Sequence, residues 1–184
     1  MSWRHKSTSA GELGTALYEH LRAALEGDGP LSLSSLFAAL TQRGMEADLN
    51  FAGEAMIGAM FGAAIATDRS TTSVMGREIL EGMTREFNSH LREQGASAEQ
   101  QVEWLVILKD RFQAFRTAME GYDGLEPPWK LGREFLWNLT GLEEYDALLI
   151  KRATGYLMDA VDAAQRLLND LGPRLKLDPT LPGT

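Results

Sequence analysis

FAGEAMIGAMFGAAIA, residues 51–66, is the most apolar stretch of this 184-residue chain, and the other segments are expected to pack around it. Its last twelve residues carry no charge, and Glu54 is its one ionic side chain. A helix without a polar face is buried on most sides. The stretch is also shorter than the roughly 20 apolar residues that cross a bilayer. We therefore predict a helix at the centre of the fold.

Two glycines in this stretch indicate close packing against a neighbour. Gly58 and Gly62 are four residues apart, so they lie on one face of a helix. Each costs about 1 kcal/mol relative to alanine in a helix interior, and a tight crossing with another backbone would offset that cost. Met60 and Met83 are expected near this crossing. The alternative interpretation is a slot for a small apolar ligand between the Gly58/Gly62 helix and the later helix that carries Met75 and Met83.

Apolar residues recur at helical spacing along the rest of the chain, and no segment is typical of a strand. The other segments expected to be helical are 10–26, 32–43, 72–94, 97–120, 129–139 and a last helix of roughly 30 residues that ends near residue 171. The polar segment 67–73 is expected to be a turn. The sequence thus predicts an all-α single-domain bundle of about seven helices over 10–171, with a disordered tail at 1–9 and an extended tail at 172–184.

Short polar residues mark where several of these helices begin. Ser32 is expected to cap the second helix. Ser97 with Gln100, and Thr140 with Glu143, have the spacing of a capping box, in which two side chains and two backbone amides bond reciprocally. The second pair would start the last helix near residue 140 and make it about 45 Å long.

The composition excludes several classes of function. A net charge of -8 disfavours a nucleic-acid partner and an anionic membrane surface, since both attract clustered Lys and Arg. The absence of cysteine excludes disulfides, thiolate zinc sites and a cysteine nucleophile. No apolar h-region follows the basic N-terminus, so no signal peptide is expected. Together these features favour a cytoplasmic protein.

Catalytic and metal-binding patterns are scarce in this sequence. The chain has three histidines, and the one promising pair, Glu86 with His90, provides two ligands, which do not make a metal site. Phosphate-loop, dinucleotide and nucleophile-elbow motifs are absent. Arg69 and Arg77 flank a loop before a helix N-terminus, where anions can bind, but helix capping explains the loop equally well. We predict no metal and no cofactor, and an enzyme with an unrecognised site is the third hypothesis.

Aromatic residues gather in the second half of the chain, around the Pro127–Pro128 break. Such residues fill cores or anchor interfaces, and the helix 129–139 is apolar on more sides than one core is expected to cover. We therefore predict an accessory or regulatory interaction protein that forms a homodimer through this half. The residues expected at the interface are Trp129, Arg133, Trp137, Tyr145 and Arg152, with Trp137 as the anchor.

Overall fold

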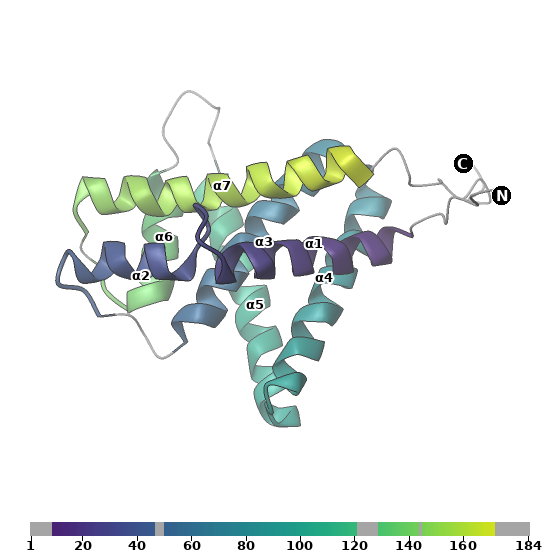
Figure 1. Ribbon diagram of the computed structural model, residues 1–184, viewed down its shortest axis with the longest axis horizontal. Coiled ribbons are helices and arrows are strands. Elements are labelled where there is room, and N and C mark those ends of the chain that lie inside the picture. The colour runs from purple at the N-terminus through teal and green to yellow at the C-terminus, as the bar shows by residue number, and fades with distance from the viewer. Residues whose placement is uncertain (1–8, 47–49, 121–128, 144, 172–184) are drawn as a thin grey trace.

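Seven α-helices account for most of the residues that the computed structural model describes, which are 9–46, 50–120, 129–143 and 145–171 (Figure 1). They are α1 (Ala10–Glu26), α2 (Leu33–Thr41), α3 (Phe51–Ser70), α4 (Ser73–Glu93), α5 (Ala98–Met119), α6 (Trp129–Thr140) and α7 (Ala147–Leu171). No strand occurs within those ranges, so the prediction of an all-α bundle is confirmed. Apart from Ser9, the two predicted tails lie outside the described residues.

Side-chain caps fix where most of the helices begin. The capping box predicted for α5 is present, with Ser97 and Gln100 each bonded to the other's backbone amide. The same arrangement, which the sequence reading did not single out, starts α1 at Ser9 and Glu12. Ser32 caps α2 by accepting a hydrogen bond from the amide of Ser35.

The central position of α3 follows from its lack of a polar face. Its residues from Glu54 to Ala64 are all buried, and α3 contacts α1, α4, α5, α6 and α7. It runs to Ser70, four residues beyond the predicted end. The hydroxyls of Thr67 and Ser70 donate to the carbonyls of Ala63 and Ala66 one turn earlier, so these polar residues fit within the helix. The predicted turn 67–73 is therefore reduced to Thr71 and Thr72.

The two glycines of α3 face two different neighbours. A Cβ atom added to Gly62 would lie 3.0 Å from the carbonyl oxygen of Leu157 and 3.1 Å from the amide nitrogen of Val161, so this glycine abuts the backbone of α7. A Cβ atom added to Gly58 would instead meet the ring of Phe135 on α6, at 2.5 Å. Neither glycine faces α4, which carries Met83.

The α1–α4 crossing, where the two helices pass over each other in Figure 1, is also built on glycine. A Cβ atom added to Gly14 would run into the carbonyl oxygen of Ile79 and lie 2.9 Å from both Gly82 Cα and Met83 N. A Cβ atom added to Gly82 would meet the backbone of Gly11 and Gly14 in return. This reciprocal contact brings the two backbones together, and the sequence reading placed its tight crossing at α3 alone.

The last helix starts later than predicted. α7 has 25 residues, about 37 Å at 1.5 Å per residue, and begins at Ala147. Asp146 caps it by accepting from the amide of Leu149 at 2.9 Å. Thr140 ends α6, where its hydroxyl donates to the carbonyl of Leu136. The predicted Thr140–Glu143 capping box is therefore wrong, because Thr140 bonds within the preceding helix.

A candidate interaction groove between α5 and α6

The orientation of α6 is set by its buried face. Gly132 lies against α7, where an added Cβ atom would be 2.7 Å from the carbonyl oxygen of Ile150. Phe135 stacks on Tyr156 of α7, with ring centres 5.2 Å apart and ring planes inclined by 16°. Because these residues face inward, the opposite face of α6 presents Arg133 and Trp137 to solvent.

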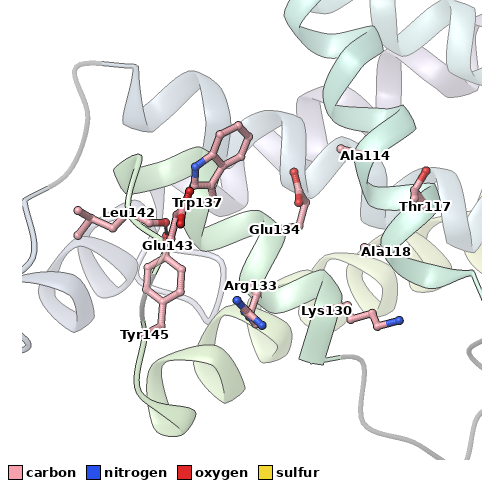
Figure 2. A pocket seen from close by; sticks show the side chains of 10 residues that line it. All are labelled: Ala114, Thr117, Ala118, Lys130, Arg133, Glu134, Trp137, Leu142, Glu143 and Tyr145. Carbon is pink, nitrogen blue, oxygen red and sulfur yellow. Dashed lines mark hydrogen bonds between the residues drawn. The ribbon is translucent and has the colours of Figure 1, made fainter.

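A groove of about 720 Å³ runs along that outer face. Figure 2 shows its lining from three places: α5, α6 and the connection from α6 to α7. The lining residues are Ala114, Thr117 and Ala118 of α5, Lys130, Arg133, Glu134 and Trp137 of α6, and Leu142, Glu143 and Tyr145 of the connection. Small side chains on α5 leave the space that the larger ones border.

Trp137 is held in place by a chain of contacts that starts on the central helix. Its side chain is 44% exposed, and the guanidinium carbon of Arg111 lies 5.5 Å from its ring centre. Arg111 in turn donates from Nε and Nη2 to the carboxylate of Glu54, at distances of 2.9 to 3.1 Å. The stack is a cation–π contact. The exposed indole of α6 is thereby tied to α3 through α5.

Glu54 makes the fold depend on its ion pair with Arg111. It is 4% exposed, at the start of the run from Glu54 to Ala64 in which every residue of α3 is buried. A buried carboxylate needs a charged partner with several hydrogen bonds, and Arg111, which lies 57 positions further along the chain, meets that need. The fork of the guanidinium fixes the plane of Arg111, and its central carbon lies over the ring of Trp137.

Tyr145 secures the other end of the groove. Its hydroxyl is within hydrogen-bonding distance of the Thr140 hydroxyl, 3.0 Å away, and it donates to the carbonyl oxygen of Leu142. Burial raises the pKa of the Tyr145 hydroxyl above its ordinary value. These bonds close the turn between α6 and α7 and hold Leu142 at the groove edge.

Three of the five residues expected at the interface meet in this groove. Arg133, Trp137 and Tyr145 line it. Trp129 is 39% exposed at the start of α6 but is not among the lining residues, and Arg152 lies on the exposed outer face of α7. The sequence reading missed the α5 wall and the Arg111 support, because α5 shows no local signal for which of its faces meets α6.

Histidines do not gather into a metal site in the parts of the chain that the structure describes. There, no group of three or more His, Asp or Glu side chains is placed to hold an ion. His90, which shares a helical face with Glu86, is hydrogen-bonded to Gln94 at 3.0 Å. The absence of a metal stays a prediction.

Comparison with known proteins adds no relative. No family model matches the chain, and no curated protein or solved structure matches it either. Within the described ranges, none of the helices combines the length and the hydrophobicity of a membrane span. The protein is therefore described by its own structure, as an all-α bundle with a groove that is lined by an exposed tryptophan in contact with Arg111.

Proposed function

We propose that this protein is a helical interaction protein, with an accessory or regulatory role in the cytoplasm, that self-associates through the groove between α5 and α6. The observation that carries the proposal is Trp137, a large aromatic side chain that is 44% exposed yet held by Arg111. Holding an anchor in its bound orientation lowers the entropy lost on binding. Tryptophan is also enriched among the residues that dominate binding energy.

The charges around the groove favour a second copy of this chain as the occupant. Lys130 and Arg133 stand beside Glu134 and Glu143, so the lining is balanced in charge although the whole chain carries -8. Two like-charged copies repel each other least at a locally neutral surface. A two-fold interface also pairs a patch with itself, so a patch with both signs can match the basic residues of one copy to the acidic residues of the other.

An exposed apolar side chain of the groove adds contact area. Leu142 is 46% exposed and lines the groove. In the two-fold arrangement Trp137 of each copy would enter the groove of the other. The ligand slot between α3 and α4 finds less support, because Met60 and Met83 are packed in the core and the α3 glycines face other helices.

Size exclusion with light scattering on the full chain tests this proposal. At tens of micromolar the mass should be about twice the 20.3 kDa of one chain. Trp137→Ala should weaken the dimer by at least about 2 kcal/mol, or about 30-fold in dissociation constant. Trp129→Ala is the matched control, since it removes an exposed tryptophan of the same helix outside the groove.

Two outcomes would refute the proposal. A mass near 20 kDa for the unmodified chain would exclude self-association at these concentrations. A dimer that Trp137→Ala and Trp129→Ala weaken equally, or not at all, would place the interface elsewhere. A thermal melt of each variant by circular dichroism separates loss of the interface from loss of the fold.

A further inference from the structure

A second hollow lies between α4 and α5, separate from the groove between α5 and α6 that Trp137 lines (the Trp137 groove). These helices meet at their connection and separate from there (Figure 1). The cleft has a volume of about 700 Å³. Arg77 and Arg85 line it from α4, and Arg116 lines it from α5, so arginine side chains border it on both sides.

None of these three arginines forms an ion pair with an acidic residue in the described parts of the chain. Among the described residues, the ion pairs within 4.0 Å are formed by Arg22, Arg43 and Arg111. Asp68 and Glu81 also line the cleft, but neither is within that distance of an arginine. The three arginines outnumber these two acidic residues, so the cleft lining has a net charge of +1 in a chain whose net charge is -8.

The spacing of the arginines sets the shape of what they can bind. Arg77 and Arg85 are eight residues apart on one helix, which is about 12 Å at 1.5 Å per residue. An anion with charges along its length can contact Arg77, Arg85 and Arg116 together, whereas one phosphate group would need the long side chains of Arg77 and Arg85 to converge on it. Guanidinium groups match phosphate oxygens with two parallel hydrogen bonds each.

We infer that the cleft between α4 and α5 binds an extended phosphate-bearing anion, with Arg77, Arg85 and Arg116 as its ligands. This inference is independent of the Trp137 groove, because the two hollows share no lining residue. The net charge of -8 repels a polyanion from the molecule as a whole. Binding therefore has to come from the local arginines rather than from general attraction.

Isothermal titration of the full chain with tripolyphosphate, at low ionic strength, tests the inference. We expect one site per chain whose affinity falls as salt is added. Arg77→Gln and Arg116→Gln should each weaken binding at least tenfold. Glu81→Gln should tighten it, because that change removes an acidic neighbour from the cleft. Inorganic phosphate should bind at least tenfold more weakly than tripolyphosphate, since it carries less charge and contacts fewer of the arginines at once.

Arg166→Gln is the matched control. Arg166 is an exposed arginine of α7 that also lacks an ion pair in the described structure, and it is not among the cleft residues. Its loss should leave tripolyphosphate binding within twofold of the unmodified chain. The inference is overturned if tripolyphosphate does not bind, if Arg166→Gln weakens binding as much as Arg116→Gln, or if inorganic phosphate binds equally well.

Discussion

Gly14→Ala probes the α1–α4 crossing with a single added methyl group. The atoms that a Cβ at Gly14 would meet are backbone atoms of Ile79, Gly82 and Met83. A side chain can rotate away from a new methyl group, but a helical backbone can give way only if the two helices separate. We therefore expect this substitution to destabilise the fold, although alanine is intrinsically the better helix former.

The size of the effect follows from two opposing contributions. Replacing glycine by alanine within a helix stabilises it by about 1 kcal/mol. Overpacking a core contact typically costs about 1–3 kcal/mol, and backbone neighbours place Gly14 at the upper end of that range. The net loss is then about 2 kcal/mol, or roughly 4–8 °C in melting temperature for a chain of this size.

Gly155→Ala provides the matched control. Gly155 lies within α7, and an added Cβ atom there would have nothing within 4 Å. The same chemical change should therefore stabilise the fold by about 1 kcal/mol and raise the melting temperature by roughly 2–4 °C. Thermal and urea melts followed by circular dichroism at 222 nm measure both variants under identical conditions.

The two variants should thus move in opposite directions from the unmodified chain. If Gly14→Ala melts at or above the unmodified temperature, the backbones of α1 and α4 are not in the contact described. If Gly155→Ala destabilises as much as Gly14→Ala, the effect of the substitution does not depend on the crossing. Either result would refute the reasoning from close approach.

Two further pairs of substitutions test the support of Trp137 and the start of α7. Arg111→Met should lower the free energy of unfolding, measured by urea denaturation, by about 3 kcal/mol, because Glu54 would be left buried without its partner. Adding Glu54→Met should recover most of that loss. A loss below about 1 kcal/mol for Arg111→Met alone would argue against the pair. Asp146→Ala should cost about 1 kcal/mol through the lost cap, whereas Glu143→Ala should stay within about 0.5 kcal/mol. Equal losses at these two positions would restore the rejected capping box.

Part of the candidate site was accessible from the sequence. Trp137, Arg133 and Tyr145 were expected at an interface because aromatic and arginine residues gather in the second half of the chain, and all three line one groove. Arg152 and Trp129 fall outside it. Which residues line the groove depends on how α6 is rotated against α7. That rotation is set by the contacts of Gly132 and Phe135 with α7, and the spacing of residues along the sequence does not indicate it.

Local sequence patterns were enough to predict most of the helices. Apolar spacing, Ser97 with Gln100 and the uncharged run of α3 predict helix type, start and burial, since each depends on residues within a turn or two. The end of α3 and the start of α7 were missed where hydroxyl side chains bonded back into a helix instead of capping the next one.

Contacts between distant segments were decided by the tertiary structure. Three such contacts join residues on different helices: the packing of Gly58 and Gly62 against their neighbours, the Gly14–Gly82 crossing, and the pairing of Glu54 with Arg111. A glycine permits close approach without specifying what approaches, and a charged residue accepts any opposite charge within reach. The partners are chosen when the helices pack, because packing alone sets which backbones and which charges come together.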